Sequence, residues 1–210
     1  MHIIRLAALG LGILLTMVGR ANGAIPDVQI GAATVVVNSV YGTPVSTQQS
    51  LWLRPGMDVF QNEAILTGEN SASRMLFKDD TQIFIGAISY LRLDKFVYDP
   101  DPSTSAVVLS FVKGVFRFVG GKLSEDRYSI HTPAASITVR GTAFTVLILP
   151  RGSEYISVES GTIYVTCHRG ATQAVHAGEM TYIRSPQGSP SAAQPAIPLP
   201  AVTQMDTLLR

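Results

Sequence analysis

Residues 128–146 constrain the fold more than any other part of the chain, because their apolar positions alternate and then change parity. Between Pro133 and Gly141 the large apolar residues stand at odd positions, Ile137 and Val139, and after Gly141 the bulkiest stand at even positions, such as Phe144. Successive residues of a strand face opposite sides, so this change requires an extra residue, a bulge or a corner. Glycine, which lacks a Cβ, readily adopts the positive φ of such a corner. The pattern predicts a strand, a corner at Gly141 and a second strand.

Short strand-like segments separated by turn signals continue through the rest of the chain. A polar turn at residues 78–81 separates two apolar pairs as in a β-hairpin, and Gly114 and Gly161 each interrupt a strand pattern. After the N-terminal region, no segment of ten or more residues has the period of 3.6 that is typical of an amphipathic helix. We therefore expect an all-β fold, an irregular stack of short hairpins that is β-sandwich-like or β-solenoid-like, with no significant helix.

The N-terminus has the layout of a secretory signal peptide. A basic start at residues 1–5 precedes an uncharged apolar run at 6–18, and the small residues Ala21 and Gly23 follow. The apolar run is shorter than the roughly 20 residues of a membrane span. We expect residues 1–23 to be removed and the protein to be periplasmic or secreted, without an integral span after cleavage. An uncleaved anchor is the alternative, which Arg20 favours.

The remaining chain divides into a domain and a tail by composition. Residues 24–184 are expected to form one all-β domain, and residues 185–210 a Pro/Ala/Ser-rich tail with prolines at 186, 190, 195, 198 and 200. Such a composition cannot fill a core and indicates an extended linker. The last residues, TQMDTLLR, are expected to be a frayed end more readily than a docking segment.

Charge and cysteine content exclude several classes of protein. The chain has 16 Lys and Arg and 15 Asp and Glu residues, and cleavage removes two of the basic ones, Arg5 and Arg20. A nearly neutral chain without a basic run has no electrostatic footprint for nucleic acid and no polybasic patch for anionic lipid. The single cysteine, Cys167, excludes an intramolecular disulfide, and we expect a passive thiol at a strand end.

Motifs of catalysis are missing from the sequence. It has no Gly-x-Ser-x-Gly, His-Glu-x-x-His, Cys-x-x-Cys or phosphate-binding glycine loop, so we expect neither an enzyme nor a cofactor. His131, His168 and His176 lack metal-ligand spacing and are expected at the surface or in turns. Asp99 and Asp101 are a weak basis for calcium, so no metal site is expected. Four carboxylates are expected to be solvated at turns: Glu63, Glu69, Asp79 and Asp80.

A set of short motifs runs through the predicted domain. They are E-x-I-x-T-G at 63–68, F-x-D-x-T at 77–81, GVFRFVGGK at 114–122, Thr132-Pro133, VRGT-x-F at 139–144, V-x-x-G at 158–161 and A-G-E at 177–179. Together they resemble the FecR family, named for the ferric-citrate regulator of bacterial envelopes, over about residues 56–183. The resemblance implies a periplasmic all-β module without catalytic residues.

Membrane-anchored FecR proteins relay the occupancy of a TonB-dependent transporter to a sigma factor, through a cytoplasmic segment and a transmembrane helix that precede the domain. Here only about two dozen residues precede the expected mature start, so we expect a stand-alone exported FecR-like module. Its motif residues are expected to have a structural or partner-binding role: Thr132, Pro133, Val139, Arg140, Gly141, Thr142 and Phe144.

Arg140 should face away from the core, because Ile137 and Val139 face it. Its guanidinium could bond strand-end carbonyls or a carboxylate such as Glu159 or Glu179, and we favour this structural role over ligand contact. An exposed edge strand is a second route to partner binding.

Two functional hypotheses follow. The first is a non-enzymatic binding or signalling module of the bacterial envelope that acts on a protein partner. The second is a structural or polysaccharide-binding module, whose exposed aromatic residues would stack on sugar rings; the candidates are Trp52, Tyr90 and Tyr98.

Overall fold

The computed structural model describes residues 27–97 and 105–210. The predicted signal peptide, the aspartates at 99 and 101 and the tyrosine at 98 lie outside these residues. Within them, fifteen strands form one large mixed sheet, accompanied by a single α-helix and a short 3-10 helix. The prediction of an all-β fold is therefore confirmed.

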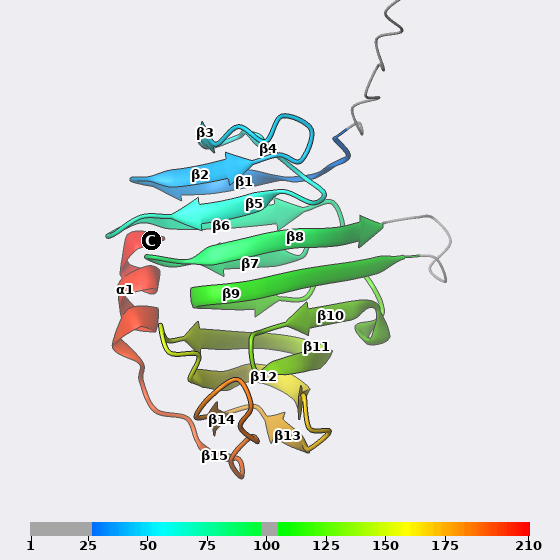
Figure 1. The fold of residues 1–210 in the computed structure, drawn as a ribbon. Coiled ribbons are helices and arrows are strands. Elements are labelled where there is room, and N and C mark those ends of the chain that lie inside the picture. The colour runs from blue at the N-terminus through cyan, green and yellow to red at the C-terminus, as the bar shows by residue number, and fades with distance from the viewer. Residues whose placement is uncertain (1–26, 98–104) are drawn as a thin grey trace, which may run out of the picture.

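The strands are β1 (Gln29–Val37), β2 (Val40–Thr43), β3 (Leu51–Trp52), β4 (Asp58–Phe60), β5 (Ala64–Thr67), β6 (Ala72–Phe77), β7 (Gln82–Ile85), β8 (Tyr90–Val97), β9 (Ala106–Val119), β10 (Tyr128–His131), β11 (Ala135–Ile148), β12 (Glu154–Cys167), β13 (Thr172–His176), β14 (Glu179–Ile183) and β15 (Gln194–Pro195). The 3-10 helix η1 is Glu125–Arg127, and the α-helix α1 is Pro200–Leu208. Figure 1 shows the strands stacked from β3 and β4 at one end to β15 at the other.

Three long strands fold the sheet back on itself. β9, β11 and β12 each have 14 residues, and the two halves of each pair with different neighbours. The first half of β11 pairs with β10 and its second half with β9, while β12 pairs with β14 at its start and with β13 at its end. The sheet therefore forms two layers. Layer A contains β14, β7, β6 and β1, and layer B contains β13, β10, β8 and β5, with the long strands passing from one layer to the other.

The predicted corner in β11 is present. Gly141 has φ 58°, and the register between β11 and β12 shifts between Arg140 and Ala143 and again before Phe144. The chain stays one continuous strand through this bulge, so the parity of the buried side chains changes without a break in the ladder. Gly114 in β9 and Gly161 in β12 have φ values of 103° and 74°, so each long strand has a glycine in the left-handed region.

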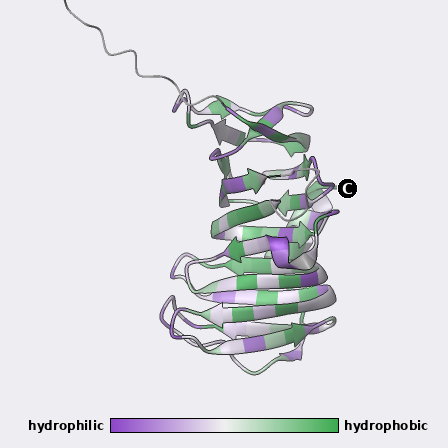
Figure 2. Cartoon of the chain, turned by 90° about the vertical axis from the view of Figure 1, so that its right-hand side faces the viewer, coloured by the Kyte–Doolittle hydropathy of each residue, from purple (hydrophilic) through white to green (hydrophobic). Residues whose placement is uncertain are grey.

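The core lies between the two layers and is rich in stacked phenylalanines. Phe111 and Phe116, on either side of the β9 corner, stack with ring centroids 4.4 Å apart, and the ring of Phe118 lies 5.3 Å from that of Phe144. All four side chains are fully buried, and each such burial contributes roughly 1.5–3 kcal/mol to stability. Hydrophobic positions recur along the strands throughout the stack (Figure 2).

The C-terminal segment is ordered, contrary to the expectation of a frayed end. After β14 the chain pairs with it again through β15, and α1 then lies beside the ends of the central strands (Figure 1). Met205 of α1 is completely buried. With nine residues, the one α-helix in the described part of the chain is too short to cross a membrane.

Candidate functional site

The motif residues of β11 gather at the corner where the strand passes from layer B to layer A. Val139 and Phe144 are buried in the core on either side of it, and Gly141 forms the turn itself. Thr142 is buried too, whereas Arg140 is exposed on the outside. The structure therefore brings together five of the seven expected residues. The other two, Thr132 and Pro133, lie in the turn that precedes the start of β11.

The corners of β11 and β12 fit against each other. A Cβ at Gly161, in the β12 corner, would overlap the backbone carbonyl oxygens of both Arg140 and Gly141. Glycine at 161 therefore satisfies two requirements at once, because its φ of 74° is strained for other residues and its neighbours leave no room for a side chain.

A small pocket of about 180 Å³ lies beside this corner, lined by Gly120, Tyr128, Thr142 and Ser160 among others. The buried hydroxyl of Thr142, one of the lining residues, has no hydrogen-bond partner in the described part of the chain. The last glycine of the G-V-F-R-F-V-G-G-K motif, Gly121, packs so closely on the carbonyl of residue 79 that it too excludes a side chain.

Arg140 points outward, as expected. Its guanidinium carbon lies 6.0 Å from the ring centroid of Tyr164 on the neighbouring strand, within the range of a cation–π contact. Both residues border an open hollow with Thr138. The two carboxylates suggested as its partners bond other groups. Glu159 pairs with Arg117, and Glu179 accepts a hydrogen bond from the backbone N–H of His176.

The F-x-D-x-T motif forms a buried polar cluster. Asp79, expected at a solvated turn, is fully buried and accepts hydrogen bonds from the hydroxyls of Thr81 (2.6 Å) and Tyr128 (2.7 Å). The Tyr128 oxygen in turn accepts the backbone N–H groups of Gly121 and Leu123. Burial raises the pKa of Tyr128 to about 12. The cluster joins the β6–β7 hairpin to the loop after β9, so the motif holds two distant segments together.

The FecR protein family matches residues 63–173, which contain the Asp79 cluster and the Gly141 corner. The chain belongs to the FecR family. No curated protein matches this sequence.

Two solved structures, each of a candidate anti-sigma factor from Parabacteroides distasonis, share the fold. They superpose with TM-scores of 0.52 and 0.51 at 15 % and 13 % sequence identity. In both comparisons the match covers 63 % of this chain and 59 % of the solved one, so this chain spans less than two thirds of those structures.

A second FecR motif, E-x-I-x-T-G, also forms internal hydrogen bonds. Glu63, expected to be solvated, is 1 % exposed and accepts a hydrogen bond from the backbone N–H of Phe60 at 2.8 Å. Burial raises the pKa of Glu63 to about 7, although the hydrogen bond from Phe60 acts to lower it. Thr67 donates to the carbonyl oxygen of Gly86 and accepts from the N–H of Ser89, so it joins β5 to the turn before β8. Glu69 and Asp80 are exposed, as predicted.

The Thr132-Pro133 motif holds a buried carboxylate that the sequence did not reveal. Glu154, fully buried at the start of β12, accepts hydrogen bonds from the Thr132 hydroxyl (2.6 Å) and the Ala134 N–H (2.9 Å). Burial raises its pKa, although both hydrogen bonds act in the opposite direction. His168 bonds the carbonyl oxygen of Pro133 at 2.9 Å. A carboxylate 22 and 20 residues beyond its two partners gives no local signal, because glutamate beside a turn is usually solvated.

The histidines and the cysteine in the described part of this FecR fold form no metal-binding cluster with the carboxylates. His131, His168 and His176 are exposed, as predicted, and Cys167 is a buried free thiol. Among residues 27–97 and 105–210, no three His, Cys, Asp or Glu side chains are placed to hold a metal ion. Trp52 is 58 % exposed, with its ring 6.0 Å from that of Tyr41.

Proposed function

We propose that this chain is an exported, non-enzymatic FecR module that acts in the bacterial envelope through contacts with a protein partner. The observation that supports it most is that its buried carboxylates stabilise the fold. Glu63, Asp79 and Glu154 are each buried and each accept a hydrogen bond from another part of the chain's own fold. A carboxylate occupied in this way is not poised to exchange a proton with a substrate, because substrate cannot reach it.

Family membership supports the signalling part of the proposal. FecR proteins are regulatory, and the solved structures with this fold are candidate anti-sigma factors. The expected signal peptide supports export, and the exposed side of the Gly141 corner, with Arg140 and Tyr164, is accessible to a partner.

The proposal is tested by crosslinking in the envelope of cells that express the full chain. We expect one envelope protein to copurify with the crosslinked chain, and mass spectrometry to find a mature N-terminus at Ala24. A photo-crosslinking residue at Arg140, compared with one at exposed Arg151, would locate the contact. Retention of the chain in the cytoplasm, or substrate turnover by the purified protein, would contradict the proposal.

Polysaccharide binding is a second candidate, favoured by one specific observation. Trp52, on the edge strand β3, lies beside Tyr41 of β2. With Asn38 and Arg54 it borders a hollow of about 270 Å³. Exposed aromatic rings next to hydrogen-bonding groups suit the faces and hydroxyls of sugars. Glycan pull-down with the full chain and with Trp52→Ala tests this function. Retention that depends on Trp52 would support it, and equal or absent retention would exclude it.

A further inference from the structure

The helix α1 is an addition to the FecR match, which ends at residue 173. It has nine residues, its N-cap position is Leu199 without a side-chain cap, and it has no acidic residue in the first turn and no basic residue in the last. Helices shorter than about 12–15 residues are marginal in water even with good sequences. The surface on which α1 lies must therefore stabilise it.

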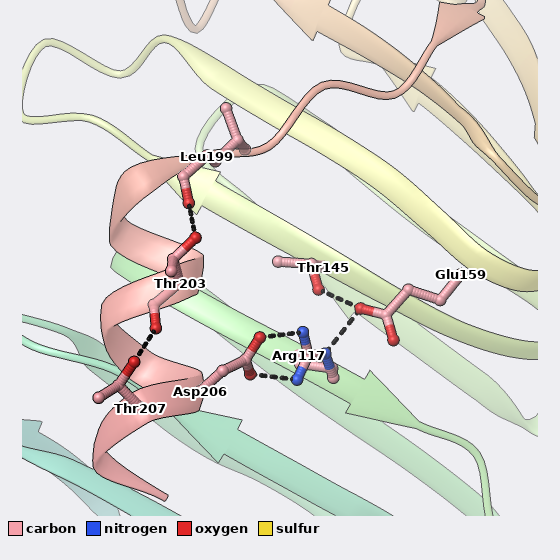
Figure 3. A network of polar contacts seen from close by, with 7 residues as sticks. All are labelled: Arg117, Thr145, Glu159, Leu199, Thr203, Asp206 and Thr207. Atoms are coloured by element: carbon pink, nitrogen blue, oxygen red, sulfur yellow. Dashed lines mark hydrogen bonds and ion pairs between the residues drawn. The ribbon is translucent and has the colours of Figure 1, made fainter.

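The first contact of α1 with this surface is a bidentate ion pair. Arg117, on the outer side of β9, donates from Nη1 and Nη2 to the two carboxylate oxygens of Asp206, the Nη2 bond measuring 3.0 Å (Figure 3). Its Nε donates to Glu159 at 2.6 Å, and Thr145 donates to the same Glu159 oxygen. The Arg117 guanidinium also lies 5.9 Å from the ring centroid of Phe84.

Electrostatics favours two carboxylates around this arginine. Burial by itself would lower the pKa of Arg117, but its hydrogen bonds to Asp206 and Glu159 outweigh burial and raise it. Planar guanidinium groups bind carboxylates in this two-point geometry, which specifies direction as well as charge. If α1 dissociated from the sheet, Glu159 would still hold Arg117 in place. The Nη1 and Nη2 groups that bind Asp206 would then be available to another carboxylate.

The second contact is a knob-in-hole fit. Met205 is the one buried residue of α1. A Cβ placed at Gly86 would overlap the Val115 side chain and would lie 3.1 Å from the Cβ of Met205. The missing side chain at Gly86 therefore leaves room for both Val115 and the methionine. Gln204 adds a hydrogen bond to the Asn70 side chain at 3.1 Å. The other residues of α1 are half-buried or exposed. One fully buried side chain, one ion pair and one surface hydrogen bond are thus its specific contacts, fewer than those in the ladders that hold the strands.

We propose that this surface, formed by Asn70, Phe84, Gly86, Arg117 and Glu159 and named the α1 site, receives a helix of a partner protein, and that α1 occupies it in the free chain. The partner helix presents an unbranched apolar residue followed directly by an acidic one, as Met205-Asp206 does in α1. The proposal rests on the proposed function in taking the partner to be a protein. Because α1 is weakly held, a longer helix with these two residues displaces it.

The full chain with Met205→Asp tests this proposal, because a carboxylate at the knob position cannot enter the apolar hole beside Gly86 and Val115. The probe is a fluorescent peptide of residues 196–210. We expect it to bind the Met205→Asp chain and to bind the wild-type chain roughly tenfold or more weakly, because the tethered helix competes at a high effective concentration. Met205→Leu, which retains the knob, should behave as wild type.

Charge reversal makes the test specific. A peptide with Asp206→Arg should not bind the Met205→Asp chain, but should bind the chain that carries both Met205→Asp and Arg117→Glu. Circular dichroism and the melting temperature establish that each chain is folded. Absence of peptide binding to a folded Met205→Asp chain, or binding that is indifferent to the charge reversal, would overturn the proposal.

Crosslinking in the envelope separates this inference from the proposed function. If the α1 site receives the partner, Met205→Asp should raise and Arg117→Glu should lower the yield of the crosslinked envelope protein. Equal yields from all three chains would overturn the inference while leaving the proposed function intact. Charge-dependent peptide binding with no protein captured in the envelope by any chain would count against the proposed function, and therefore against the protein partner that this inference takes from it.

Discussion

The hydroxyl of Tyr128 donates a hydrogen bond to the buried carboxylate of Asp79 across 2.7 Å, joining β10 to a hairpin 49 residues earlier in the chain. Tyr128→Phe removes this bond and leaves the carboxylate without one of its donors. We expect a loss of about 1–3 kcal/mol in the free energy of unfolding, which urea denaturation measures. Tyr182→Phe is the control, because the hydroxyl of Tyr182 bonds no described side chain, and an equal loss in both variants would contradict this role.

The same tyrosine predicts a loss of stability at high pH. Its pKa is about 12 in the fold against 10.0 for an ordinary tyrosine, so the folded state retains a proton that the unfolded chain releases. A pKa raised by folding gives stability that is complete below pH 10 and is lost as the pH rises toward 12. Thermal melts of wild type and Tyr128→Phe between pH 9 and 11 should converge, and parallel curves would refute the prediction.

Glu63 predicts a second pH dependence, near neutrality. Its pKa of about 7 exceeds the ordinary 4.5, so its contribution to stability is complete below pH 4.5 and is lost as the pH rises through 7. The loss amounts to at most about 3 kcal/mol. Glu63→Gln keeps the acceptor for the Phe60 N–H but cannot ionise, so its melting temperature should vary less between pH 4.5 and 8. Glu69→Gln, at an exposed turn, should leave the wild-type profile unchanged.

Because the corners of β11 and β12 fit against each other, alanine should destabilise the fold more at Gly161 than at Gly178. Gly161→Ala adds a Cβ that overlaps the carbonyls of Arg140 and Gly141 at a φ of 74°. Gly178→Ala, at φ 82°, meets no atom within 4 Å and bears the conformational cost alone. We expect a loss of about 1 kcal/mol for Gly178→Ala and a further 1–3 kcal/mol for Gly161→Ala, measured by urea denaturation. Equal losses would show that the corners do not constrain each other.

Arg140→Ala tests the role of the outward-facing motif residue. The guanidinium contact with Tyr164 is exposed, so its loss should cost only about 0.5–1 kcal/mol and lower the melting temperature slightly. Arg151→Ala, at an exposed loop, is the matched control for charge. If the melting temperature stayed at the wild-type value while crosslinking to the partner was lost, Arg140 would be a binding residue and the structural role would be wrong.

The corner in β11 could be predicted because its cause is local. The change of parity from Val139 to Phe144 and the glycine between them are visible in six consecutive residues, and any fold that buries both sides must bend there. The exposure of His131 and Asp80 followed from the same turn logic. The all-β class followed from the strand-like segments and the lack of a helical period, which are also local properties.

The buried carboxylates and the position of α1 depended on the tertiary structure. Glutamate and aspartate beside turns are usually solvated, and only partners from other strands make their burial tolerable: Tyr128 for Asp79, and Thr132 for Glu154. The nine residues of α1 are too few to form a stable helix by themselves, and they form one because Arg117, 89 residues before Asp206, binds them. Periodicity and turn chemistry thus determined where this chain bends. Contacts between segments distant in sequence decided which polar groups are buried and where on the sheet the C-terminal helix lies.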